Sequence, residues 1–427
     1  MEQDKILYYV DSIHYPEAEG NDRRDANNTI VQVSLLDINK AEVPNDIVVS
    51  VPIEQLSFEN GKKIEDNNFV YYSANNQIPF ENGNKDPRAL ELINQSSKLR
   101  KGLREKSQNR PIELSRADTL IDSKVTSYHI NVGHGNCSVI LIESGNFYRI
   151  WMVDCGTNYY VKGPHLENID ECFDDIAKRL GVNKDQLHIS LFMLTHLHGD
   201  HYNGIEMLFN RGYCDASTQF FINLDYAVAS TAYVSILDKI NNAGCLVNTP
   251  IRNISPEHEL LYAPSVIFPD KRLFKNNPSP IHIPCYIEPK ANNSSAIYLI
   301  FGSGKSMMFP GDMEKKELDL MTSSSNCTPF LNMVDYYCVS HHASITGHLD
   351  CRCLDPRHPC SSCIRCCKNN LDRAIVMGRD GAFKGIYNPN VINDFGANLV
   401  FSEKDVTGKA AKCLILDWAS NTCFYLY

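Results

Sequence analysis

Residues 195–204 have the sequence THLHGDHYNG, and they directly follow an apolar stretch, ISLFML, at residues 189–194. His196 and His198 alternate, so in an extended chain their side chains lie on one side. Asp200 and His201 come after a bend and can serve a second metal ion. Imidazole and carboxylate groups suit Zn, Mn or Fe, and a loop at a strand end can point all four inward. Core packing hardly explains this spacing, so the sequence predicts a metal site.

Three further stretches follow in a recognisable order. Residues 153–156 read VDCG, residues 309–312 read FPGD and residues 338–344 read CVSHHAS. With residues 195–204 they resemble the motifs of the metallo-β-lactamase-fold hydrolases, over about residues 127–427. The resemblance implies an α/β fold, a four-layer αβ/βα sandwich. It also implies a metal-dependent hydrolase with two divalent ions, Zn being expected first and Mn or Fe as alternatives.

The same resemblance implies roles for individual residues. The expected metal ligands are His196, His198, Asp200, His201, Asp312, His341 and His342. Asp312 would bridge the two ions. One of His341 and His342 would bind metal and the other would face the substrate, and the sequence leaves open which. Asp154 would orient the metal-binding loop through hydrogen bonds.

A subgroup within this superfamily matches further residues. Residues 131–137 (NVGHGNC) and 292–295 (NNSS) resemble the metallo-β-lactamase domain of bacterial DNA-uptake (competence) channel proteins. That subgroup lacks a histidine which many relatives carry ahead of the Gly-Asp strand, and residues 292–295 occupy its place here. His258 and His282 lie nearby, but their spacing fits poorly, so the first metal ion is expected to lack one histidine. His134 is either a structural loop residue or a substrate contact.

The chain of 427 residues is long enough for two domains. Residues 1–86 predict a small β-rich domain for partner or substrate recognition, and residues 87–125 a basic helix (87–108) and a linker. Residues 126–427 predict the catalytic domain. Apolar runs predict strands at 6–10, 30–36, 47–51, 69–72 and 189–194, a hairpin at 139–153 and a helix near 170–180. Neither a signal peptide nor a membrane-spanning run is recognisable, which favours a cytoplasmic protein without membrane contact.

Charge weakens a nucleic-acid interpretation without excluding it. The formal net charge of −10 repels nucleic acid unless a basic patch exists. Such a run comprises Lys98, Arg100, Lys101, Arg104, Lys106, Arg110 and Arg116. Nucleic acid or a small phosphodiester therefore stays open as a substrate.

Six of the sixteen cysteines gather in an apparent insertion at residues 348–368. They are Cys351, Cys353, Cys360, Cys363, Cys366 and Cys367. Short paired spacings favour a structural zinc ion, which would fix a segment that has few apolar residues. An iron–sulfur cluster and disulfides are the alternatives. The position after the His-His motif suggests a wall or lid beside the active site.

The favoured function is that of a phosphodiesterase or nuclease using a metal-bridging hydroxide, with a possible role in bacterial antiviral defence. Asp200 would hold the nucleophile and the metals. Whichever of His341 and His342 is not a ligand would hydrogen-bond the substrate or protonate the leaving group. A thioester, lactone or other acyl hydrolase is the first alternative. The second is a partner-regulated effector subunit whose N-terminal domain docks another protein.

Overall fold

The computed structural model describes residues 6–14, 30–39, 46–73, 79–108, 124–157, 165–224, 228–248, 265–267, 292, 295, 297–315, 318, 334–348, 371–382 and 386–427. The six clustered cysteines at 351–367 lie outside the described residues, and so do His258 and His282. The zinc prediction for that segment therefore stays a prediction.

An antiparallel sheet forms from the N-terminal residues, in the order β3-β2-β1-β4-β5. Its strands are β1 (Ile6–His14), β2 (Ile30–Asp37), β3 (Asp46–Pro52), β4 (Phe69–Tyr72) and β5 (Phe80–Asn82), with a 3-10 turn, η2, at Ile53–Gln55. Side chains alternate between the faces of a strand. Tyr8 and Val10 of β1 pack in a core of this sheet's own. Leu7 and Tyr9 instead belong to the core of the main body, so both faces are buried. The first four strands lie where apolar runs predict them.

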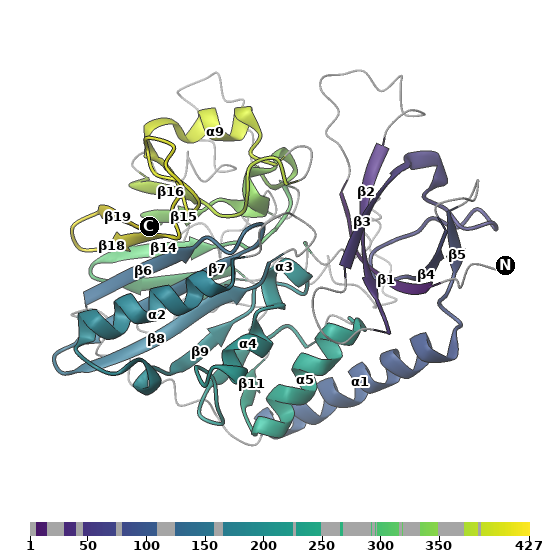
Figure 1. The fold of residues 1–427 in the computed structure, drawn as a ribbon, viewed down its shortest axis with the longest axis horizontal. Helices are drawn as coiled ribbons and strands as arrows, with labels where there is room; N and C mark the ends of the chain where they lie inside the picture. The colour runs from purple at the N-terminus through teal and green to yellow at the C-terminus, as the bar shows by residue number, and fades with distance from the viewer. Residues whose placement is uncertain are drawn as a thin grey trace, which may run out of the picture.

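Helix α1 (Pro87–Gln108) connects this sheet to the rest of the chain and has the predicted bounds. It packs along α5 (Thr231–Ala243), as Figure 1 shows. The hydroxyl of Ser96 donates a hydrogen bond to the carbonyl of Val228, and Arg100 donates to the carbonyl of Leu224 at 3.1 Å. The helix is thus fastened to the main body. Among the described helices, none is both long and apolar enough to cross a membrane.

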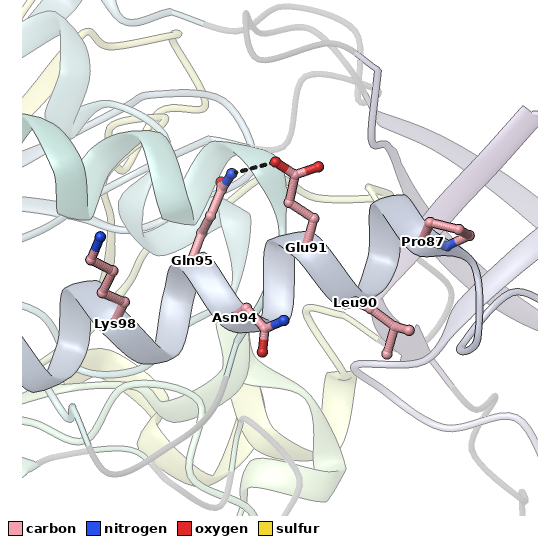
Figure 2. Close-up of a pocket in the computed structure, with 6 residues that line it drawn as sticks. All are labelled: Pro87, Leu90, Glu91, Asn94, Gln95 and Lys98. Atoms are coloured by element: carbon pink, nitrogen blue, oxygen red, sulfur yellow. Dashed lines mark hydrogen bonds between the residues drawn. The ribbon is translucent and has the colours of Figure 1, made fainter.

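A shallow pocket lies along α1 and is lined by side chains of that helix alone (Figure 2). The lining residues are Pro87, Leu90, Glu91, Asn94, Gln95 and Lys98. The Gln95 amide donates a hydrogen bond to Glu91 at 3.1 Å. None of the predicted metal ligands lines this pocket, so the candidate site lies elsewhere.

The first sheet of the main body has eight described strands, in the order β11-β10-β9-β8-β7-β6-β18-β19. They are β6 (Lys124–Ile130), β7 (Cys137–Ser144), β8 (Phe147–Cys155), β9 (Ile189–Met193), β10 (Gln219–Phe221), β11 (Leu246–Asn248), β18 (Cys413–Asp417) and β19 (Thr422–Leu426). The predicted hairpin is β7–β8, and β9 is the predicted strand before the metal motif. The helix expected near 170–180 is α2 (Glu167–Leu180), followed by the 3-10 turn η4 (Lys184–Gln186). Ile169, Phe173 and Ile176 recur at helical spacing on its buried face.

The second sheet has six described strands, in the order β12-β13-β14-β15-β16-β17. They are β12 (Ser265–Ile267), β13 (Ile297–Gly302), β14 (Lys305–Phe309), β15 (Tyr336–Cys338), β16 (Arg373–Val376) and β17 (Leu399–Phe401). Short helical elements follow some of these strands: η8 (Ser340–Ala343), η9 (Ile345–Gly347), α9 (Pro389–Phe395) and η10 (Gly396–Asn398).

The cores show how these elements are layered. Trp151 of the first sheet and Tyr298 of the second pack in one core between the two sheets. Phe173 of α2 and Ile236 of α5 pack on the outer side of the first sheet. Phe395 of α9 packs in a third core outside the second sheet. The order of helices, sheet, sheet and helix (Figure 1) confirms the predicted four-layer αβ/βα sandwich behind an N-terminal β-sheet.

Candidate metal centre

The loop after β9 carries the first two predicted ligands. Strand β9 ends at Met193, and residues 195–199, named the metal loop here, lead into the short helix α3 (Gly199–Tyr202). His196 and His198 are buried, and Nε2 of His196 lies 3.2 Å from Nδ1 of His198. The two imidazoles therefore lie on the same side of the loop, as their alternation predicts.

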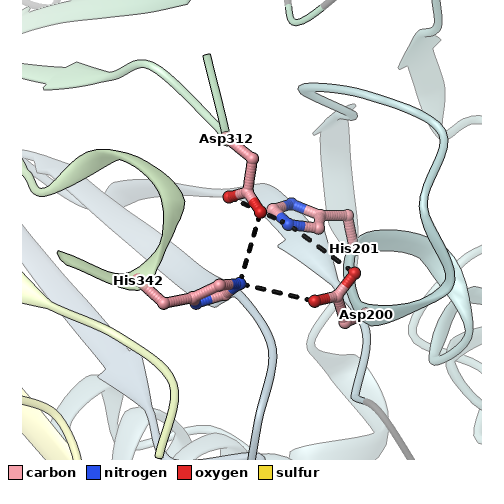
Figure 3. Close-up of side chains that lie close together, drawn as sticks. All are labelled: Asp200, His201, Asp312 and His342. Atoms are coloured by element: carbon pink, nitrogen blue, oxygen red, sulfur yellow. Dashed lines mark ion pairs between the residues drawn. The ribbon is translucent and has the colours of Figure 1, made fainter. Parts of the chain in front are cut away.

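Two side chains on α3 meet two from the second sheet. Asp312 follows the end of β14, and His342 lies in η8. One ligand atom from each of Asp200, His201, Asp312 and His342 lies within 4.8 Å of the others (Figure 3). Nε2 of His342 is 3.4 Å from an oxygen of each carboxylate, and Nε2 of His201 is 3.3 Å from Asp312. We call these four residues the ligand group; the fold brings them together from three separate motifs.

The paired histidines of the metal loop lie beside the ligand group. The His196 and His201 ring centroids are 4.0 Å apart, and those of His196 and His198 are 4.8 Å apart. His134 contacts the group at His342 and Asp200. Its ring centroid is 4.3 Å from that of His342, and its Nε2 is 3.7 Å from Asp200. His134, His196 and His198 therefore all lie close to the ligand group.

The neighbouring histidines of the last motif take different positions. Nε2 of His341 is 4.0 Å from Asp312, and its Nδ1 hydrogen-bonds the hydroxyl of Thr346 at 2.9 Å. His341, His342 and Ala343 have φ angles of 50°, 50° and 60°, in the left-handed region that side chains disfavour. Such strain gathers at functional sites. The turn sends the two imidazoles apart, and only His342 joins the ligand group.

Asp154 fixes the start of the metal loop. Its buried carboxylate accepts hydrogen bonds from the backbone N–H of Thr195 at 2.7 Å and from the Thr195 hydroxyl at 2.8 Å. It also lies 2.8 Å from Nδ1 of His201. This bond holds Nε2 of His201 toward the ligand group, and the Met377 carbonyl holds His342 likewise by accepting from Nδ1 at 3.1 Å. Asp154 thus lies where the sequence predicts an orienting residue. Met377 was missed, because a backbone acceptor leaves no mark in the sequence.

Close backbone packing supports α3 from behind. A Cβ on Gly156 would lie 2.4 Å from the backbone nitrogen of His201, and one on Gly135 would lie 2.1 Å from the carbonyl oxygen of Gly156. The backbone N–H of Asn136 donates to the carbonyl of Asp200 at 3.0 Å. Only glycine fits at the two contact positions. Residues 131–137 and 153–156 therefore pack against the backbone of α3, the helix that carries Asp200 and His201.

Burial keeps the two histidines of the metal loop neutral. It lowers the pKa of His196 well below its usual range, and the charge of His201 adds to the effect. Burial also lowers the pKa of His198 to about 4. A neutral imidazole offers a lone pair to a metal ion. Both side chains are therefore in ligand form at neutral pH.

Charge dominates within the ligand group. Burial is the largest single effect on His342 and favours its neutral form, but the Asp312 and Asp200 carboxylates together outweigh it and raise the pKa of His342 to about 10. The pKa of His201 is raised well above its usual range by Asp312, Asp154 and Asp200, also against burial. Burial would raise the pKa of Asp200 and Asp312, yet the two imidazoles hold both well below the usual range. The group is thus a compact set of alternating opposite charges.

The donor set fits divalent cations. Nε2 of His198 is buried and makes no hydrogen bond with the described residues. Nε2 of His201, Nε2 of His342 and one oxygen of Asp312 are also buried without a hydrogen bond there, and they are engaged only in the ion pairs of the ligand group. A buried polar atom without a hydrogen bond raises the free energy of the folded protein, whereas coordination to a metal ion would satisfy that atom. Imidazole nitrogens and carboxylate oxygens are common ligands of zinc.

Comparison with known proteins gives no close relative. No family model matches the sequence, and neither does any curated protein. Three solved structures share part of the arrangement at 11% sequence identity: the metallo-β-lactamase fold protein YhfI from Bacillus subtilis, a long form RNase Z from yeast and a diphosphatase of the PhnP family. The match to YhfI has a TM-score of 0.33 and covers 65% of this chain and 96% of that protein. The match to RNase Z has a TM-score of 0.33 and covers 84% of this chain and 52% of that protein. The match to the diphosphatase has a TM-score of 0.31 and covers 66% of this chain and 96% of that protein. Likeness at this level identifies neither family nor substrate, so the site is interpreted from its own contacts.

Proposed function

We propose that this chain is a hydrolase that uses two divalent metal ions to cleave phosphodiesters. The observation that carries the proposal is the ligand group itself: two carboxylates and two imidazoles whose ligand atoms lie within 4.8 Å of one another, all buried except the partly exposed Asp200. Its imidazoles are oriented by the hydrogen bonds that they donate to the Asp154 carboxylate and the Met377 carbonyl, as is usual around metal ligands.

The residues divide into two sets of ligands. Asp200, His201, Asp312 and His342 would hold one ion. His196 and His198 would hold the other beside them, with one histidine fewer than the family pattern. Bound divalent cations would acidify a water molecule and neutralise negative charge on the substrate. Zn is the ion expected first for a histidine-rich set of this kind.

His341 is placed to act on the substrate. Its side chain retains about 11% exposure, whereas that of His342 is 1% exposed. Its Nδ1 is engaged by Thr346, and its Nε2 lies at the edge of the ligand group. From there Nε2 would donate a hydrogen bond to a substrate oxygen or give a proton to the leaving group. Roles in antiviral defence and in docking a partner stay predictions.

Substrate class is tested directly on the full chain. Protein loaded with Zn²⁺ or Mn²⁺ should hydrolyse bis(p-nitrophenyl) phosphate, and a chelator should abolish that activity. The same preparation should act far more slowly on a p-nitrophenyl ester, a thioester and a lactone. Hydrolysis of the acyl substrates without hydrolysis of the phosphodiester would contradict the proposal and favour the alternative, an acyl hydrolase. Activity that survives the chelator would contradict metal dependence.

Metal loading should release protons. The raised pKa values mean that His201 and His342 carry protons at pH 7 in chelator-treated protein, and both must lose them to bind a cation. We expect one to two protons released per chain, and an apparent Zn²⁺ affinity that rises about tenfold per pH unit for each proton between about pH 6 and pH 8. Calorimetric titration in two buffers with different ionisation enthalpies measures the release. Binding without proton release would show that the ligand group is not where the ion binds.

A further inference from the structure

Strand β1 of the N-terminal sheet contains a β-bulge at Asp11. Val10 pairs with Leu35 of β2 and Ser12 pairs with Ser34, so Asp11 is the extra residue between them. A bulge of this kind bends a strand and redirects a side chain. The Asp11 side chain is buried, with about 6% of the residue exposed.

The redirected carboxylate reaches the metal loop. An oxygen of Asp11 accepts a hydrogen bond from the backbone N–H of Gly199 at 3.4 Å. Gly199 stands between His198 and Asp200 and is the first residue of α3. A buried backbone N–H needs an acceptor, and for Gly199 the Asp11 carboxylate supplies it. Asp11 therefore binds the chain at the one point between the two sets of predicted ligands.

Packing holds the N-terminal sheet at this place. Leu7 and Tyr9, which precede Asp11 on β1, share a continuous core with Leu197 of the metal loop. The hydroxyl of Thr231 at the start of α5 donates a hydrogen bond to the carbonyl of Ile38 at 3.0 Å. The approach of Asp11 to the metal loop is thus part of a built interface between the N-terminal sheet and the main body.

Carboxylates from two different sheets hold the two ends of the metal loop. Asp154 on β8 binds Thr195, and Asp11 on β1 binds Gly199. We propose that Asp11 is a positioning residue of the metal centre, through which the N-terminal sheet sets the geometry of His198 and Asp200. The inference rests on the proposed metal centre and goes beyond it, because it makes the N-terminal sheet part of the catalytic unit.

Cobalt binding by the full chain tests the inference. Co²⁺ affinity is measured by competition with a chromophoric chelator, and ligand geometry from the visible absorption of the bound Co²⁺. Asp11→Ala should weaken affinity by about 10-fold or more, as do other losses of groups that orient metal ligands, and should change the spectrum. Asp11→Asn keeps an oxygen that can accept from Gly199, so it should recover most of the affinity and the wild-type spectrum.

Val10→Ala is the matched control. Val10 neighbours Asp11 but packs in the core on the other face of the sheet. The variant should lower the thermal midpoint while leaving Co²⁺ affinity and spectrum unchanged. Wild-type affinity and spectrum in Asp11→Ala would overturn the positioning role, as would an equal loss in Val10→Ala, which would reduce the effect to general stability. If the wild-type chain bound no Co²⁺, the proposed metal centre would fail and the inference with it.

Discussion

Asp312→Ala should remove metal from the protein and lower phosphodiester hydrolysis about a thousandfold, since the charge stabilisation that metal ions supply is worth several kcal/mol. The Asp312 carboxylate lies 3.3 Å from His201 and 3.4 Å from His342, so its removal leaves Asp200 as the one carboxylate of the ligand group beside the two imidazoles. Metal content is measured by elemental analysis of the purified protein, and the rate with bis(p-nitrophenyl) phosphate.

The control for this variant is Asp335→Ala. Asp335 directly precedes β15 of the second sheet and accepts a hydrogen bond from the backbone N–H of Ser306 at 2.9 Å, but it is not part of the ligand group. It should lose stability and keep its metal. If Asp312→Ala retained the metal content and rate of the wild type, the proposed centre would be wrong.

Asp154→Ala should destabilise the protein by about 3 kcal/mol even without metal. The buried carboxylate accepts hydrogen bonds from the N–H and the hydroxyl of Thr195 and from Nδ1 of His201. Each donor left unsatisfied in the interior costs about 1–3 kcal/mol, and release of the buried carboxylate offsets part of the sum. Urea unfolding of chelator-treated protein measures the change. Metal affinity should also fall by about 10- to 100-fold.

Thr195→Val separates these contributions. It removes the hydroxyl bond to Asp154 and the longer contacts of the same hydroxyl with Nδ1 of His196 at 3.3 Å and of His201 at 3.2 Å. The Asp154 bond to His201 remains, and the change should cost about 1 kcal/mol. A loss in Asp154→Ala no larger than that of Thr195→Val would mean that Asp154 does not hold the loop and His201 together.

The predictable part of the site is the part that its local sequence determines. An apolar strand followed by alternating histidines sets both β9 and the side on which His196 and His198 lie. Asp312 could be placed through the order of motifs along the chain. The choice between His341 and His342 could not, because it depends on a left-handed turn that tertiary packing imposes.

Asp11 had no signal in the sequence at all. Its position depends on a bulge in one strand and on the packing of that strand against the main body. It also depends on a backbone N–H that is 188 residues away in the sequence. Local patterns report neither register irregularities nor contacts between sheets. The N-terminal strands themselves were predictable, because their apolar runs are bounded by polar turns.

The core shared by Leu7 and Tyr9 with the main body has a consequence for how the chain resists proteases. Separation of the N-terminal sheet from the main body would expose this apolar surface to water, which costs free energy. We therefore expect the sheet and the main body to unfold together as one cooperative unit. A ligand that binds only the closed form shifts that equilibrium in proportion to its concentration. Metal bound at the ligand group would therefore shield strands β1 to β5 from proteolytic cleavage, although none of their residues need touch the ion.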